Sequence, residues 1–310
     1  MPTFGTPAPI SVSLDIGAGS VEIIASDRAD TVVEVRPTNP AKKIDVGAAE
    51  QTRVSYSERT LTVKAPKNWR QYVVWSECGS VDVKIELPSG SQLRGEVGVG
   101  LALVGPTAGS ELRGTGILGE CMFKVGAGDI RLSQGGPLQL RTGAGDITVE
   151  RSISQSEITT ASGAVHVSRT EGATVIKNSN GDIWVGEATA DLRVTTANGK
   201  ISVALARADV EAKTANGSIQ IDEVMDGTVS ARTATGKVEV GVRRGVAALL
   251  DLETGWGKVL NGLEASGAPR PGQPSVEVRA RTGFGDIRVF RANGPEFVDS
   301  SATTPTADHG

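Results

Sequence analysis

The sequence is poor in the residues on which many active sites and membrane spans depend. Aromatic residues make up 4% of its 310 residues, and histidine and cysteine occur twice each. No apolar run reaches the length of about 20 residues that a membrane-spanning helix needs. The net charge of −4 and the pI of about 5.4 argue against nucleic acid as the main partner. The composition therefore predicts a chain without a membrane span that does not act chiefly on nucleic acid.

The scarcity of cysteine and histidine also limits the chemistry. Cys78 and Cys121 stand far apart, and two free thiols in a reducing cytosol are favoured over a disulfide. His309 falls in the C-terminal tail, so a catalytic triad would have to use His166 on an outward strand position. We therefore predict no catalytic residue, no cofactor and no metal ligand.

The N-terminal residues bear on where the protein resides. Residues 1–9 contain no basic residue and no apolar core, so they do not resemble a secretory signal. We expect a cytoplasmic protein in which these residues form a flexible lead.

What the sequence does contain is one phrase repeated between Val125 and Val289. The anchoring glycines of its six strict copies are 17 or 18 residues apart, and three looser copies follow at longer spacing. A fixed short period is typical of a repeat architecture. The structural repeat glycines are Gly128, Gly145, Gly163, Gly181, Gly199, Gly217, Gly236, Gly257 and Gly285.

Apolar and polar residues alternate on both sides of each glycine. Ile201 and Val203 follow Gly199 by two and four residues, and Leu192 and Val194 precede it in the same alternation. A period of two predicts a strand with one buried face. Each repeat is therefore predicted to be a strand, a glycine corner, a second strand and a second turn. The residue before the glycine is often asparagine, which tolerates a positive φ as glycine does.

Two architectures fit this pattern, a β-solenoid and an antiparallel meander of tight hairpins. A threonine three residues before most of the glycines favours the solenoid, because stacked hydroxyls can hydrogen-bond from rung to rung. A coil also buries its own apolar face, whereas a meander leaves that face uncovered. We predict an all-β fold, a single-stranded, β-helix-like solenoid with coils of about 18 residues, after an irregular β-rich N-terminal cap.

Shifts in composition divide the chain into five segments. They are a flexible lead (1–9), a β-rich N-terminal capping region (10–93), Gly-rich transition rungs (94–124), the solenoid repeats (125–290) with a loop insertion (262–275), and a disordered tail (291–310).

The repeated Thr-x-x-Gly-[Asp/Lys/Ser]-Ile-x-Val phrase, with the segments Gly17–Ile23 and Val33–Pro37, supports a family resemblance. Over about residues 10–290 the chain resembles the β-strand-repeat proteins called "putative adhesins", a family of unknown function, and its actinobacterial members in particular. The resemblance implies a non-enzymatic β-solenoid. It also implies a protein partner, and a small ribbon-helix-helix protein is the candidate because some relatives are encoded beside such proteins.

The few aromatic residues are the best candidates for partner binding, since Trp, Tyr and Arg are favoured at interaction hot spots. One group falls within residues 67–75, where it could instead fill the core of the N-terminal region. A pair is expected on neighbouring rungs of an outward face. The candidates are Trp69, Arg70, Tyr72 and Trp75 in the first group and His166 and Trp184 in the second. Binding is predicted to map to 67–75 or to the loop 262–275, and otherwise to the face around the pair.

The leading functional hypothesis is a cytosolic, non-enzymatic solenoid that acts as a protein-interaction or scaffold module. One alternative is an adhesin or carbohydrate-binding protein at the cell surface. A further alternative is a polysaccharide-active β-helix enzyme, for which Asp146 and Arg131 are the arguable residues. Homo-oligomerisation through the ends or the faces of the solenoid is also compatible with the sequence.

Overall fold

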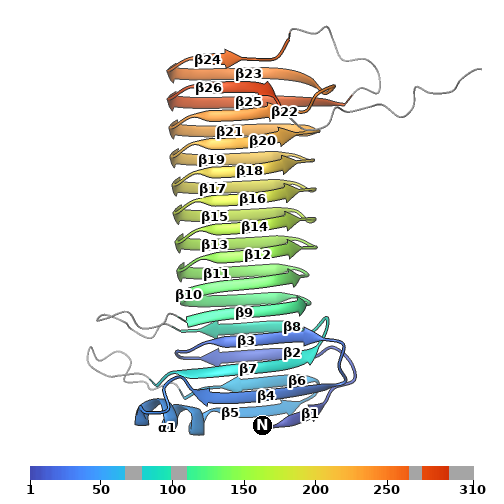
Figure 1. Cartoon of the computed structure of the whole chain (residues 1–310), viewed down its shortest axis with the longest axis vertical. Helices are drawn as coiled ribbons and strands as arrows, with labels where there is room; N and C mark the ends of the chain where they lie inside the picture. Colours follow the sequence, from blue (N-terminus) through green and yellow to red (C-terminus); the bar gives the residue numbers. More distant parts are fainter. Residues whose placement is uncertain (67–78, 99–109, 265–273, 293–310) are drawn as a thin grey trace, which may run out of the picture.

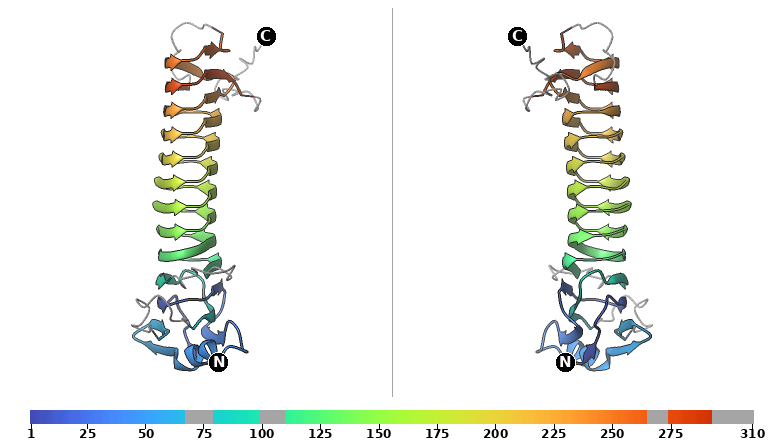
Figure 2. Two further views of the ribbon diagram at one scale, coloured as in Figure 1. Left: turned by 90° about the vertical axis from the view of Figure 1, so that its left-hand side faces the viewer. Right: turned by 90° about the vertical axis from the view of Figure 1, so that its right-hand side faces the viewer.

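The protein is a long column of stacked β-strand coils (Figure 1). The structure is a computed structural model, and it describes residues 1–66, 79–98, 110–264 and 274–292. Two thin sheets joined at their corners form the body of the column when it is seen from the side (Figure 2). The predicted all-β solenoid is therefore confirmed.

We name the two faces sheet A and sheet B, and β10 (Cys121–Gly135) runs round a corner and belongs to both. Sheet A contains β1 (Thr3–Gly5), β3 (Val21–Ser26), β4 (Asp30–Pro37), β7 (Val81–Pro88), β9 (Ser110–Ile117), β12 (Ile147–Ser152), β14 (Val165–Thr170), β16 (Ile183–Ala188), β18 (Ile201–Ala206), β20 (Ile219–Val224), β22 (Val238–Val242), β24 (Val259–Asn261) and β26 (Ile287–Arg291). Sheet B contains β2 (Ser11–Ile16), β5 (Arg53–Ser57), β6 (Thr60–Lys64), β8 (Gln92–Val97), β11 (Leu138–Ala144), β13 (Ser156–Ser162), β15 (Thr174–Asn180), β17 (Leu192–Asn198), β19 (Val210–Asn216), β21 (Gly227–Thr235), β23 (Ala247–Trp256) and β25 (Ser275–Phe284).

Each coil consists of one strand of sheet B, a glycine corner and one strand of sheet A. Val194 in β17 and Ile201 in β18 point into the space between the sheets, and both are 0% exposed. Like positions stack because the ladders are parallel and in register, so Ile201 lies between Ile183 and Ile219. The alternation in the sequence thus becomes one continuous apolar core along the axis.

The repeat glycines are required at the corners for two reasons. All nine have a φ between +137° and +156°, a range that L side chains rarely adopt. The corners also stack backbone on backbone, so a Cβ on Gly199 would lie 2.1 Å from the carbonyl oxygen of Gly181. Only glycine meets both conditions.

Polar side chains tie neighbouring corners together. The Thr233 hydroxyl donates to the carbonyl of Gly217 at 2.9 Å and the Thr282 hydroxyl donates to that of Gly236 at 2.9 Å. The predicted rung-to-rung bonding by threonine is therefore confirmed, with a glycine carbonyl of the neighbouring coil as the acceptor.

The asparagines before the glycines have a role that differs from the predicted one. Among the described residues, the non-glycine residues with positive φ are Glu58 and Arg59, so these asparagines do not use that conformation. Instead they form an amide ladder, in which Asn198 Nδ2 donates to Asn180 Oδ1 at 2.8 Å and Asn216 Nδ2 donates to Asn198 Oδ1 at 3.0 Å. Stacking at the strand spacing makes the side-chain amides hydrogen-bond to one another.

The coils do not stack in strict sequence order at either end of the column. β2 lies between β6 and β8, and β3 lies between β7 and β9. At the other end β25 lies between β21 and β23, and β26 lies between β22 and β24. The Arg291 guanidinium donates to the carbonyls of Arg243 and Val246, in the segment that connects β22 to the outermost coil. The last coil in the sequence, β25–β26, thus stacks between the coil β21–β22 and the coil β23–β24, and β23–β24 is the outermost coil.

The N-terminal end is closed by antiparallel strands and the helix α1 (Lys43–Gln51). In place of the flexible lead expected over residues 1–9, β1 pairs antiparallel with β4, and β4 pairs antiparallel with β7. β5 pairs antiparallel with β6 and is the last strand of sheet B in the part of the chain that the structure describes. The region expected to be only a cap also contributes the coil β2–β3 to the parallel stack.

Candidate functional site

The outer face of sheet A carries a stacked pair of rings. His166 in β14 and Trp184 in β16 are neighbours in the ladder. Their ring centroids are 4.0 Å apart and their planes are inclined by 12°. His166 is exposed and Trp184 is half-buried. The adjacency predicted from the repeat is confirmed, and it produces a flat aromatic platform on a rigid sheet.

Small residues surround this platform. A Cβ at Gly186 would lie 2.8 Å from Cη2 of Trp184 and 2.4 Å from the Ser168 carbonyl oxygen, so the indole extends over the glycine. Ser202 is the ladder neighbour of Trp184 on the side away from His166. One face of the indole therefore contacts the imidazole, while the other faces a short side chain.

A row of alternating charges borders the same face. Arg151 Nη2 lies 2.7 Å from Glu171 Oε1, and Arg169 lies 2.9 Å from Glu171 and 3.0 Å from Glu187. Arg207 Nε then lies 2.7 Å from Glu187 Oε1. Such exposed pairs contribute little to stability singly, but the shared carboxylates hold the guanidinium groups in place. The platform thus has an ordered polar border.

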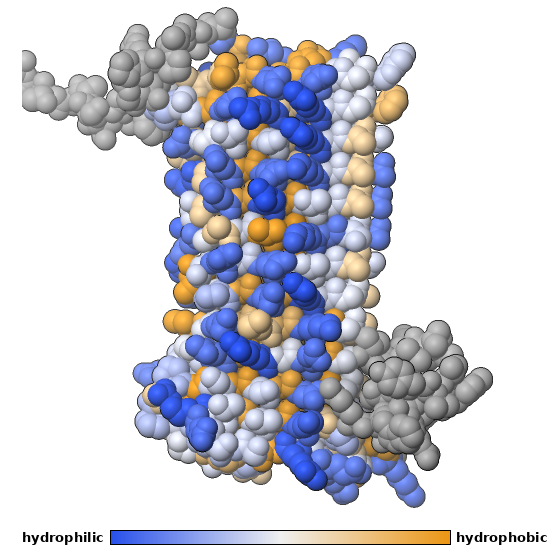
Figure 3. Space-filling model, turned by 180° about the vertical axis from the view of Figure 1, so that it is seen from behind, coloured by the Kyte–Doolittle hydropathy of each residue, from blue (hydrophilic) through white to orange (hydrophobic). Residues whose placement is uncertain are grey.

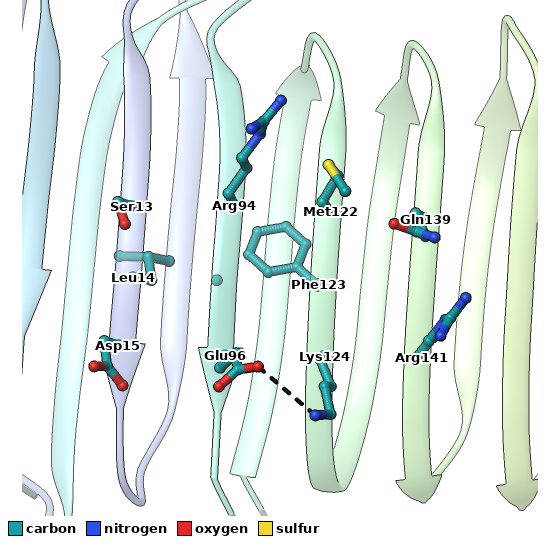
Figure 4. Close-up of a pocket in the computed structure, with 11 residues that line it drawn as sticks. Ser13, Leu14, Asp15, Arg94, Glu96, Met122, Phe123, Lys124, Gln139 and Arg141 are labelled. Atoms are coloured by element: carbon teal, nitrogen blue, oxygen red, sulfur yellow. Dashed lines mark ion pairs between the residues drawn. The ribbon is translucent and has the colours of Figure 1, made fainter.

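The outer face of sheet B has a shallow hollow of about 450 Å³ across β2, β8, β10 and β11 (Figure 4). Two rows of side chains run across these strands. One row is Ser13, Arg94, Met122 and Gln139, and the other is Asp15, Glu96, Lys124 and Arg141. Charges of both signs line the hollow, with Asp15 and Glu96 on one side and Lys124 and Arg141 on the other, and Lys124 Nζ is 3.7 Å from Glu96 Oε1. This mixture of paired charges gives the hollow no single ligand preference.

The aspartates after the repeat glycines serve the corners. Asp146 Oδ1 accepts the N–H of Ala164 at 2.7 Å, and Asp182 Oδ1 accepts the N–H of Lys200 at 2.7 Å. Each carboxylate therefore holds the next corner through the backbone. In the part of the chain that the structure describes, no group of three or more His, Cys, Asp or Glu residues is placed to hold a metal ion.

The residues considered for a polysaccharide-active site are likewise engaged. Arg131 is ion-paired with Glu111 at 2.6 Å and with Asp129 at 3.1 Å. Asp146, as above, accepts a backbone N–H from the next coil. The structure therefore gives both residues contacts that stabilise the corner and its neighbouring strands.

The other candidate binding segments are only partly described. Trp69, Arg70, Tyr72 and Trp75 lie outside the described residues, as do residues 265–273 of the loop insertion. The solenoid contributes two further exposed aromatic residues, Trp256 (75% exposed) and Phe284 (59% exposed), in the corner row at the C-terminal end. The reversed coil order places Trp256, and not Phe284, in the outermost coil, and the sequence does not indicate this order.

Cys121 is a free thiol buried in the core at the start of β10. Burial, together with the nearby charge of Glu120, raises the pKa of the thiol to about 12. In a Cys78→Ser background we expect folded protein to resist alkylation at pH 8, because the thiolate is the reactive species. Mass spectrometry with and without denaturant checks this, and rapid labelling of the folded chain would contradict the buried position.

The family model described as Toastrack DUF4097 matches residues 10–245. The chain is 10% identical to a "putative adhesin" from Bacteroides fragilis, covering 93% of this chain and 95% of that one with a TM-score of 0.38. It is 12% identical to a "putative cell adhesion protein" from Clostridium sporogenes (93% and 94% covered, TM-score 0.22). A "putative lipid binding protein" from Parabacteroides distasonis is also 12% identical (93% and 95% covered, TM-score 0.33).

The sequence matches no curated protein. Within the described residues, no helix is long and apolar enough to cross a membrane.

Proposed function

The chain belongs to the Toastrack DUF4097 family, and from this fold and its outer surface we propose that it works as a protein-interaction or scaffold module. The observation that carries the proposal is the ring pair of His166 and Trp184, stacked at 4.0 Å on the outside of sheet A. Exposed aromatic side chains are favoured at interaction hot spots, and the imidazole of His166 is exposed.

The surroundings of the ring pair support binding of a flat surface. Gly186, Ser168 and Ser202 are small, so an approaching partner can reach the indole without displacing a long side chain. The charged row through Glu171 and Glu187 supplies the polar border that surrounds the aromatic centre of many interfaces. Both features are fixed by parallel ladders, so little order has to be created on binding.

The contacts of the charged residues on sheet A favour binding over catalysis. The candidate acid and base residues on sheet A are engaged in corner hydrogen bonds and ion pairs, as Asp146 and Arg131 are. A surface whose charged groups already have protein partners suits recognition better than proton transfer. The non-enzymatic role, the cytoplasmic location and the ribbon-helix-helix partner stay predictions.

Trp184→Ala should lower the capture of the protein partner by about tenfold or more, which corresponds to the loss of one aromatic hot spot. The measurement is a pull-down from the native host, quantified by mass spectrometry, with a thermal melt of each variant. Gln220→Ala is the matched control, because Gln220 occupies the same outward position two coils further along the ladder. If both variants capture every partner as the wild type does, the ring pair is not the binding site.

Carbohydrate binding at the cell surface is the second candidate, and the uncovered face of the Trp184 indole favours it. A sugar ring can stack on such a face beside the short side chain of Ser202. Glycan-array binding that is lost in Trp184→Ala would support this candidate over a protein partner. Fractionation of the native host separates the two further, because an adhesin must reach the surface and the interaction module is expected in the cytoplasm.

A further inference from the structure

We propose that copies of this chain associate head to tail, with the C-terminal end of one column seated on the N-terminal end of the next. The two ends lie at opposite extremes of the axis (Figure 1). The occupant of each end is thus a second copy, and repeated addition gives a filament. A heterologous contact that does not close on itself generates open assemblies of this kind.

The C-terminal end presents unpaired strand edges and apolar side chains. Among the described residues no strand pairs with the outer edge of β23 or of β24. Leu249 is 67% exposed, Val259 44% and Leu260 49%, and hydrophobic residues reach the surface at this end of the column (Figure 3). Open edges of this kind recruit another strand.

The N-terminal end presents a similar edge with the opposite strand direction. Among the described residues β5 is the last strand of sheet B, and it runs antiparallel to β6 and hence to the other described sheet B strands. Its inward residues Val54 and Tyr56 are half-buried, and Tyr56 lies 5.3 Å from Phe4 of β1, ring centroid to ring centroid. The core therefore reaches both ends without being fully covered.

The register of sheet B makes the two ends complementary. We call a row of side chains at the same ladder position in successive strands a file; Tyr56 belongs to the same file as Leu250, and Val54 to the same file as Leu252. If the files continue across the junction, these apolar residues therefore meet. The same continuation brings Arg53 of one copy opposite Glu253 of the other, an attractive cross-strand pair.

Sheet A supplies a second, independent match. β24 pairs with Ile287–Val289. When these ladder positions are followed from strand to strand through sheet A, the residues of β24 align with Val21–Ile23 of β3. β1 pairs with Asp30–Val32 of β4, and its residues align in the same way with the next three residues of β3, Ile24–Ser26. When β5 of one copy pairs with β23 of the other, β1 and β24 therefore lie side by side at the same height along the axis and do not overlap. The short strands at the two ends are thus complementary in position.

Two registers of a two-fold contact between two C-terminal ends are disfavoured by charge. Antiparallel pairing of β23 with itself about Leu252 sets Asp251 opposite Glu253, and pairing about Asp251 sets that aspartate opposite its copy. Like charges directly opposite one another destabilise a ladder. Glu253 already pairs with Arg281 at 3.4 Å within its own copy. Arg53 of the next copy would then lie on the other side of Glu253, so that a negative charge stands between two positive ones.

The test is a charge exchange followed by sedimentation equilibrium over a wide range of concentrations. Wild-type chain is expected to rise above the monomer mass of 32.0 kDa as its concentration increases. Glu253→Arg and Arg53→Glu should each weaken association by about tenfold, because each turns the attractive pair into a repulsive one. The double variant, and an equimolar mixture of the two single variants, should associate as the wild type does.

Asp251→Arg is the matched control, since the continued register places Asp251 opposite the neutral Ser55, and circular dichroism confirms that each variant is folded. A wild-type chain that stays at 32.0 kDa at every concentration overturns the proposal. So does association that neither single variant weakens, or a double variant and mixture that fail to recover it.

Discussion

Ile201→Asp is expected to abolish soluble expression of the protein. Ile201 is 0% exposed and lies between Ile183 and Ile219 in the core file of sheet A. A carboxylate at this position has no cation within the apolar core, and burying an unpaired charge costs several kcal/mol. This cost is about the size of the whole stability of many proteins, which is about 5–15 kcal/mol. The measurement is the soluble fraction after expression, with a thermal melt of any protein recovered.

Two control substitutions separate the charge from the position. Ser202→Asp places the same carboxylate on the next residue, which points outward, and should leave expression and melting nearly unchanged. Ile201→Val removes one buried methylene and should cost about 0.5–1.5 kcal/mol. If Ile201→Asp expresses and melts like Ser202→Asp, the assignment of inward and outward faces is wrong.

Gly199→Val is expected to produce the second largest loss of stability. The backbone of Gly199 has a φ of +141°, and holding a β-branched residue there costs about 1–3 kcal/mol. The new Cβ would also lie 2.1 Å from the Gly181 carbonyl oxygen, so two adjacent coils have to move apart. In denaturant unfolding, the midpoint should fall, and the loss in free energy of unfolding should exceed the roughly 1–3 kcal/mol that the backbone conformation alone costs.

A glycine elsewhere in the chain provides the matched comparison. Gly47 lies in α1, and a Cβ there would contact only the end of the Gln51 side chain at 3.8 Å. Gly47→Ala should therefore be neutral or stabilising by up to about 1 kcal/mol. Gly199→Ala should still destabilise strongly, because even one methyl group meets the Gly181 carbonyl. Equal stability of the two alanine variants would rule out the close stacking of corners.

The candidate site was partly accessible from the sequence. A period of 18 residues in this part of the chain places His166 and Trp184 at the same position of successive coils, so their adjacency follows from counting. Their stacking at 4.0 Å, and the extension of the indole over Gly186, depend on side-chain rotamers that counting does not predict. The charged row through Glu171 was also missed, although alternating Arg and Glu at the coil spacing could have indicated it.

The residues of a single repeat are enough to define the coil. Alternating apolar residues set the inward face, and glycines at a fixed spacing set the corners, because each of these depends only on residues close together along the chain. The order of the coils was decided by the tertiary structure alone. β25 and β26 lie inside β23 and β24, and β2 and β3 lie between later coils. Every coil offers nearly the same file of valine, isoleucine and leucine to its neighbour, so the repeat pattern is satisfied by either order. The choice depends on contacts between distant segments, such as Arg291 on the carbonyls of Arg243 and Val246, which exist only in the folded column.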